Sequence, residues 1–161
     1  MKYRRLTQEE LESLKQEFIH FLIANGIDAP EWQKISDNDK EKANLMVDLF
    51  SDVVFEKALK NIKFLEHVSP KDIKYFFITD KKIILACIKA SDDSSLDFTN
   101  NKTISGLAEG SIELKPGELS YFSTEKDLGE EREKEVFELM QGGAEPCPKE
   151  KFDNVYSLCR K

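Results

Sequence analysis

Residues 62–90, IKFLEHVSPKDIKYFFITDKKIILACIKA, carry the clearest secondary-structure pattern of this chain. Hydrophobic and polar residues alternate along it with a period of two, as they do in half-buried β-strands. Two short polar stretches, SPKD and DK, divide the segment into three runs, so we predict a three-stranded antiparallel meander. The third run, KIILACIKA, is apolar almost throughout, which is typical of a central strand covered on both faces.

Before residue 62 the hydrophobic period is that of helices. Thr7 and Glu10 form a capping-box pattern, which places the start of the first helix at this point. Gly26 is suited to a left-handed helix stop, so the first helix is expected over roughly residues 7–25. A short helical turn over residues 30–35 and a longer helix over residues 39–61 are expected to follow.

After residue 90 the strand signals are weaker. One short strand is expected around Leu96 and Phe98, and three more are expected at residues 103–107, 111–114 and 119–123. A helix is predicted over residues 127–140, with Asp127 as its cap, and the tail is expected to end in a short helix.

These patterns predict an α+β fold of N-terminal helices, an antiparallel β-meander sheet of five to seven strands, and a C-terminal helix. The length of 161 residues predicts one domain over residues 1–161. Its parts are expected to be helical over 1–61, sheet over 62–124, and helix and tail over 125–161.

Composition excludes several classes of protein. Lys and Arg number 24 against 31 Asp and Glu, a net charge of −7, which argues against nonspecific nucleic-acid binding. Three cysteines are too few, and an odd number, for a disulfide scaffold. Neither a signal peptide nor an apolar run long enough to span a membrane is found, so we expect no membrane association and a soluble, cytoplasmic protein with reduced thiols.

The predicted pairing of the strands singles out one carboxylate. If Val68 faces Ile73, Glu66 lies opposite Tyr75 on an apolar sheet face. A carboxylate in such a place is suited to line a pocket and to act as an acid or base with a raised pKa. The alternative is that Glu66 is exposed at the strand end, or pairs with Tyr75 or a helix lysine.

The same register places His67, Lys74 and Cys87 in one row across three strands. Neighbouring strands lie about 4.8 Å apart, so the histidine and the cysteine are expected about 10 Å apart, too far for a nucleophile and its base. Metal-ligand spacings, phosphate-binding glycine loops and a nucleophile-elbow serine are also missing. We therefore assign no catalytic, cofactor-binding or metal-binding residue and expect no cofactor; whether the protein is an enzyme stays open.

The interpretation that these observations favour is a non-enzymatic protein–protein interaction module, because catalytic signatures are lacking and apolar side chains occur on most faces of the expected elements. Its partner is expected to be another protein or a second copy of the chain. The candidate contact residues are those of the basic arm and of the tail: Tyr3, Arg4, Arg5, Phe152 and Tyr156. The alternative is a small-ligand-binding or enzymatic pocket lined by Glu66 and Tyr75.

Three stretches resemble one known family: MKYRRLTQEELESLKQEFIHFLIANGI, FSDVVFEKALKNIKFLEHVSPKDIKYF and NVYSLCR. That family consists of small uncharacterised proteins found mainly in Bacteroidetes-group bacteria. The resemblance covers somewhat under half of the chain and implies a bacterial cytosolic protein of unknown function. It brings no active-site residues.

Overall fold

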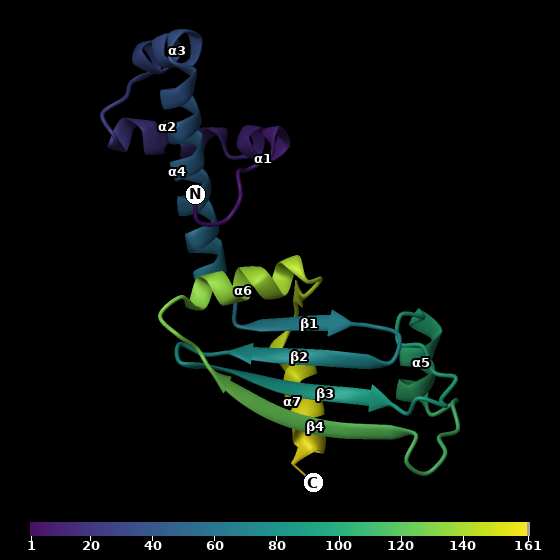
Figure 1. Ribbon diagram of the computed structural model, residues 1–161. Helices are drawn as coiled ribbons and strands as arrows, with labels where there is room; N and C mark the ends of the chain where they lie inside the picture. The colour runs from purple at the N-terminus through teal and green to yellow at the C-terminus, as the bar shows by residue number, and fades with distance from the viewer. Residues whose placement is uncertain (161) are drawn as a thin grey trace. The chain divides into compact units, whose positions relative to one another are not determined.

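The computed structural model describes residues 1–160, and within them the chain forms seven helices and five strands (Figure 1). The predicted α+β class is confirmed, with helices first, then an antiparallel sheet, then a C-terminal helix. The residues separate into two compact units, one of residues 1–61 and one that begins at Ile62. A single folding domain for the whole chain stays a prediction.

The first unit is helical. Its helices are α1 (Gln8–Ser13), α2 (Lys15–Ala24), α3 (Ala29–Asn38) and α4 (Lys40–Lys60). The capping box is present, because the Thr7 hydroxyl accepts from the Glu10 N–H at 3.2 Å and the Glu10 carboxylate accepts from the Thr7 N–H at 2.8 Å. The single helix predicted over residues 7–25 is instead interrupted at Leu14, which separates α1 from α2. None of the α1 side chains is buried, so no core contact keeps the two helices continuous.

Aromatic side chains from three helices pack together in this unit. The Phe18 ring lies 5.2 Å from Trp32, edge to face, and 5.0 Å from Phe50. The hydroxyl of buried Ser51 accepts from the Leu6 N–H at 3.0 Å and donates to the Val47 carbonyl at 2.8 Å. This hydroxyl therefore ties the N-terminal arm to α4.

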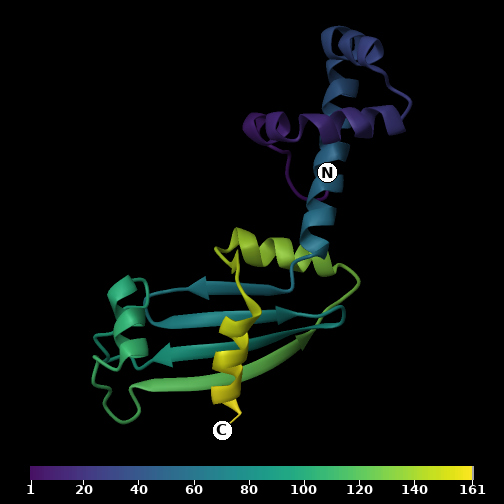
Figure 2. The ribbon, with the colours of Figure 1, turned by 180° about the vertical axis from the view of Figure 1, so that it is seen from behind.

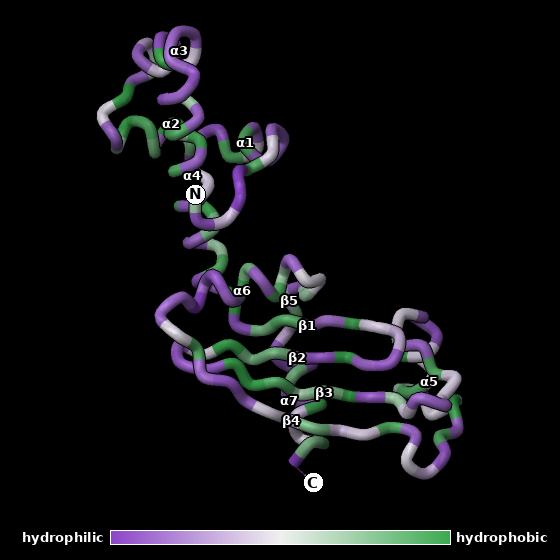
Figure 3. Tube along the Cα trace, in the orientation of Figure 1, coloured by the Kyte–Doolittle hydropathy of each residue, from purple (hydrophilic) through white to green (hydrophobic). Residues whose placement is uncertain are grey.

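The second unit is built on a five-stranded antiparallel sheet with the order β4-β3-β2-β1-β5. The strands are β1 (Phe64–Val68), β2 (Asp72–Ile78), β3 (Lys82–Ala90), β4 (Leu119–Asp127) and β5 (Glu145–Pro146). The predicted register is confirmed, since Val68 faces Ile73 and Glu66 faces Tyr75. Figure 3 shows hydrophobic segments along β2 and β3, with hydrophilic turns between them.

Helices cover both faces of the sheet. Helix α7 (Lys149–Cys159) crosses β2, β3 and β4 on one side, which we call the α7 face (Figure 2). There Phe152 and Val155 join a core with Tyr75, Ala86 and Phe98. The opposite side, the α6 face, carries α6 (Arg132–Gln141), whose side chains line a groove together with residues of β2 and β3.

A buried arginine holds the start of α6 in place. Arg132 is 9% exposed; its Nε donates to the Thr79 carbonyl at 3.1 Å and its Nη2 donates to the Ile62 carbonyl at 2.6 Å. Val136, one helical turn further, is fully buried. These contacts fasten α6 to the sheet end where β1 begins and β2 ends.

The region after β3 differs most from the prediction. Residues 103–107, expected as a strand, lie in α5 (Asn101–Glu109), which Asn100 caps by accepting from the Lys102 N–H at 3.0 Å. The close approach of Ile112 to Gly106 folds the following loop back onto this helix. Residues 111–114 and the segment around Leu96 and Phe98 form no strand, although both of these side chains are buried in the core.

Candidate functional site

Glu66 and Tyr75, the predicted pocket pair, lie directly opposite each other on the α7 face. Tyr75 is 8% exposed within the core beneath α7. The Glu66 carboxylate accepts from the Lys151 ammonium of α7 at 3.0 Å and 3.4 Å. The helix-lysine alternative for Glu66 is therefore the arrangement found, and α7 covers this part of the sheet.

The groups around Glu66 are poor catalysts at neutral pH. Burial, with smaller contributions from the charges of Glu66 and Cys147, raises the pKa of Tyr75 to about 12. Burial and then the Glu66 charge also raise the pKa of the Cys147 thiol. Both groups keep their protons near pH 7, so this cluster supplies neither a phenolate base nor a thiolate nucleophile.

The Tyr75 phenol gives a test of this environment. A phenol ionises near pH 10 in an unfolded chain, so the folded state holds this proton more tightly. The resulting stabilisation is present at neutral pH and is expected to be lost as the pH rises from about 10 to about 12. Absorbance at 295 nm is expected to show one phenolate forming near pH 12, and Tyr75→Phe is expected to remove that step. An unchanged high-pH step in the variant would contradict the assignment.

The row His67, Lys74 and Cys87 is present as predicted, with Lys74 between the other two in the register. Cys87 is buried, and burial raises the pKa of its thiol to about 11, with a smaller contribution from Asp72. Gly143 lies against the His67 imidazole, because a Cβ at this glycine would stand 3.2 Å from Nε2. Cys87 and His67 are therefore both packed against neighbouring groups on the α6 face.

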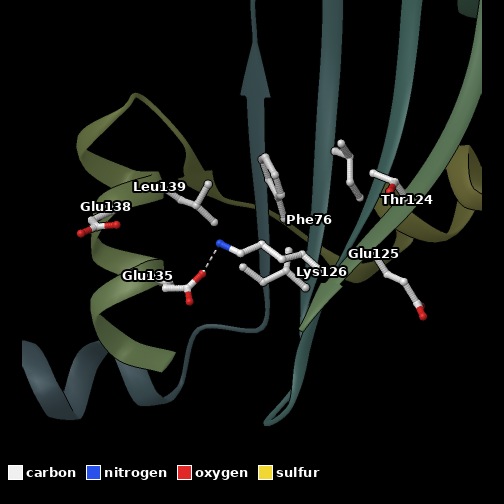
Figure 4. A pocket seen from close by; sticks show the side chains of 9 residues that line it. Phe76, Thr124, Glu125, Lys126, Glu135, Glu138 and Leu139 are labelled. Atoms are coloured by element: carbon white, nitrogen blue, oxygen red, sulfur yellow. Dashed lines mark hydrogen bonds and ion pairs between the residues drawn. The ribbon is translucent and has the colours of Figure 1, made fainter. Parts of the chain in front are cut away.

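A groove that sequence reasoning did not identify runs between the sheet and α6 (Figure 4). Its volume is about 390 Å³, which is within the range of small-molecule sites. The floor is apolar and consists of Phe76, Ile83, Leu85 and Leu139. The signal was the alternation of apolar residues along β2 and β3, but only the path of α6 shows which of them stay uncovered.

A charged pair crosses this groove. In Figure 4 the Lys126 side chain extends from β4 toward α6, and its ammonium donates to the Glu135 carboxylate at 2.8 Å. This hydrogen bond, and then the charge of Glu135, raise the pKa of Lys126. The side chain therefore stays cationic, and Glu135 of the same unit neutralises its charge.

The basic arm is also neutralised inside its own unit. Arg4 pairs with Glu10 at 2.9 Å, and Arg5 pairs with Asp48 at 2.6 Å. The Arg4 hydrogen bond is the main reason that the pKa of Glu10 is lowered to about 2. The Tyr3 hydroxyl donates to Glu56 at 2.5 Å. These contacts order the arm on α1 and α4.

The predicted tail surface needs a correction. Phe152 is 3% exposed and belongs to the core, so the expectation that it contacts a partner is wrong for this side chain. Tyr156, one helical turn further along α7, is partly buried. Its ring stacks on Phe152 with the centroids 5.1 Å apart, and the Arg160 guanidinium lies 5.2 Å from the centroid of the Tyr156 ring. The tail is apolar because it covers the sheet.

The outer edge of β4 is the most open part of the sheet. The Leu128 N–H donates to the Lys81 carbonyl, and the Ser91 N–H donates to the Glu118 carbonyl. These two hydrogen-bonded pairs continue the β3–β4 register by one position at each end of the ladder. Hydrogen-bonded pairs alternate in antiparallel ladders, so even-numbered residues of β4 bond to β3. The N–H and C=O groups of the odd-numbered residues point outward: Leu119, Tyr121, Ser123, Glu125 and Asp127.

The two edges of the sheet differ in how they are protected. The edge formed by β5 has only two residues, and one of them, Pro146, has no N–H to offer. The edge formed by β4 has nine residues without proline, and eight of them are exposed to solvent. Short strands and prolines are the usual protection of an edge, so β4 is the longer edge that stays able to pair with another strand.

Among residues 1–160, no three His, Cys, Asp or Glu side chains gather as a metal site would require. None of the described helices has both the length and the apolar character needed to cross a bilayer. No curated protein and no solved structure matches the chain. A model of a protein family does match, over residues 1–160, and the chain therefore belongs to the family of unknown function DUF6495.

Proposed function

We propose that this chain is a non-enzymatic protein-interaction module that takes up an extended strand of another polypeptide at the open edge of β4. The observation that carries the proposal is the row of outward-pointing backbone groups along nine residues of β4. Such a row is a template for strand addition, in which main-chain hydrogen bonds supply affinity.

The side chains of β4 support the same proposal. Residues 119–124, LSYFST, carry no charge, and Tyr121 and Phe122 are 39% and 42% exposed on opposite faces of the sheet. Exposed aromatic side chains are enriched among the residues that dominate protein interfaces. A strand added beside β4 would cover both of these rings.

The alternative of a ligand pocket at Glu66 and Tyr75 has less support. Lys151 holds the carboxylate, and the phenol lies in the core beneath α7. A ligand would have to displace the helix before it could reach either group.

Proline at Ser123 tests the proposal. The Ser123 N–H points outward, so Ser123→Pro removes a group offered to a partner without removing a β3–β4 hydrogen bond. With a photo-crosslinking residue at position 121 in the full chain, we expect a discrete cross-linked protein in the host cell. The cross-link is expected to fall at least tenfold in Ser123→Pro, the loss that about 1.4 kcal/mol of binding energy produces.

Two controls make the result specific. Ser123→Ala keeps the N–H and is expected to cross-link like the parent chain. Thr124→Pro removes an inward N–H and is expected to unfold β4, which circular dichroism would report. A cross-link that survives Ser123→Pro in a folded chain, or no cross-link from the parent, contradicts the proposal.

A further inference from the structure

We infer that the strand taken up at β4 is β4 of a second copy, antiparallel, with Thr124 facing Thr124 across a two-fold axis. The inference rests on the proposed function and names the partner of that edge. Three properties of β4 and α7 select the occupant and the register. They are the alternation of inward and outward backbone groups along β4, the position of the α7 end, and the order of the side chains along β4.

The alternation of outward and inward backbone groups limits where the two-fold axis can pass. Only odd-numbered residues of β4 have outward N–H and C=O groups, so odd residues of one copy must face odd residues of the other. A two-fold axis that passes between two residues would pair odd with even positions and leave the outward groups without partners. The axis must therefore pass through a residue.

The end of α7 then selects the residue. The Cys159 thiol donates to the Phe122 carbonyl at 3.2 Å, and Figures 1 and 2 show α7 ending at the β4 edge. An axis through Phe122 would bring the two helix ends to the same point. With the strand spacing of about 4.8 Å included, an axis through Ser123 separates them by two residues and about 8 Å, and one through Thr124 by four residues and about 14 Å.

Packed helices need about 8–10 Å between their axes. An axis through Ser123 reaches only the lower end of this range. The axis through Thr124 is the first that clears all of it, and it retains more paired residues than any axis further along β4. Four outward residues of each copy are then paired: Tyr121, Ser123, Glu125 and Asp127.

The side chains are complementary in this register. Tyr121 faces Asp127 of the second copy, which is suited to accept from the phenol. Phe122 faces its Lys126, whose hydrocarbon stem suits an aromatic ring while its ammonium stays on Glu135. Ser123 faces Glu125, so no two like charges are opposite each other. Asp127 of the second copy also lies on the α7 face, toward the basic helix end at Arg160.

Disulfide trapping in the full chain tests the register. Cys147 and Cys159 are replaced by serine, while Cys87 is kept because it is buried and resists ionisation. Thr124→Cys places two thiols in a non-hydrogen-bonded antiparallel pair, with Cα atoms about 4.5 Å apart, which a disulfide can join. The matched control is Ser120→Cys, whose two copies would lie eight residues apart, about 27 Å.

Mild oxidation is expected to yield disulfide-linked dimer at least tenfold faster from Thr124→Cys than from Ser120→Cys, and Ser123→Pro is expected to abolish the difference. Light scattering is expected to give twice the chain mass before oxidation. Equal rates for the two cysteines would overturn the register, and a monomer that does not cross-link would overturn the second copy as occupant. If the position-121 cross-linker still captures a different protein in a Ser123→Pro-sensitive way, the proposed function stands and only this inference fails.

Discussion

Arg132→Ala is expected to lower the free energy of unfolding by about 3–4 kcal/mol. The guanidinium is almost fully buried and donates to two main-chain carbonyls, those of Thr79 and Ile62. Alanine would leave both carbonyls short of a donor and would remove the link between α6 and the sheet. A hydrogen bond from a charged donor contributes about 1.5–3 kcal/mol, and two such bonds are lost.

Urea unfolding followed by far-UV circular dichroism measures the loss. The only tryptophan, Trp32, lies in the first unit, so amide exchange in β1 and β2 is the better local probe of this change. Arg132→Lys keeps the charge but lacks the forked donor geometry, so an intermediate loss is expected. A change below 1 kcal/mol in the alanine variant would show that Arg132 does not hold α6.

Phe152→Ala is expected to lower the free energy of unfolding by about 3–5 kcal/mol, the usual range for removing a buried phenylalanine. The ring lies 5.8 Å from Phe64 and 5.7 Å from Phe77, and it joins α7 to β1 and β2. Alanine leaves a cavity between helix and sheet that neighbouring side chains fill only in part. Thermal unfolding measures the effect, and Phe152→Leu, which keeps most of the volume, is expected to lose less than half as much.

An association experiment with a Phe152 variant must take this loss of stability into account. Loss of assembly in Phe152→Ala would follow from damage to the core, so the variant does not test a partner surface. Tyr156→Ala, at a partly exposed position, is expected to cost less stability. If Phe152→Ala were as stable as the parent chain, α7 would not be packed on the sheet as described.

The central sheet was predictable because its information is local. Strand runs with a period of two, joined by short polar turns, allow few registers, and a slip by one residue would expose every buried side chain. Glu66 facing Tyr75 and Lys74 facing Cys87 follow from that rule alone. The Thr7–Glu10 capping box was predictable for the same reason, since its partners are three residues apart.

Residues 103–107 show where local patterns mislead. A short segment that contains a β-branched threonine and an isoleucine reads as a strand, yet Asn100 caps it and Gly110 ends it as a helix. The boundary at Asp127 was misplaced because pairing with Lys82 of β3 extends β4 to that residue. In both cases a contact outside the segment selected its structure.

The local pattern of residues 62–90 was enough to predict a meander, the residues that face each other in it, and the need to cover both of its faces. Which helix covers which face could be known only from the folded chain: Lys151 binds Glu66 across 85 positions, and Phe152 enters the core. The open edge of β4 was decided in the same way, because an edge exists only once the order of strands is settled. Side-chain period and turn length act over a few residues, whereas helix docking and strand order depend on contacts between segments far apart in the chain.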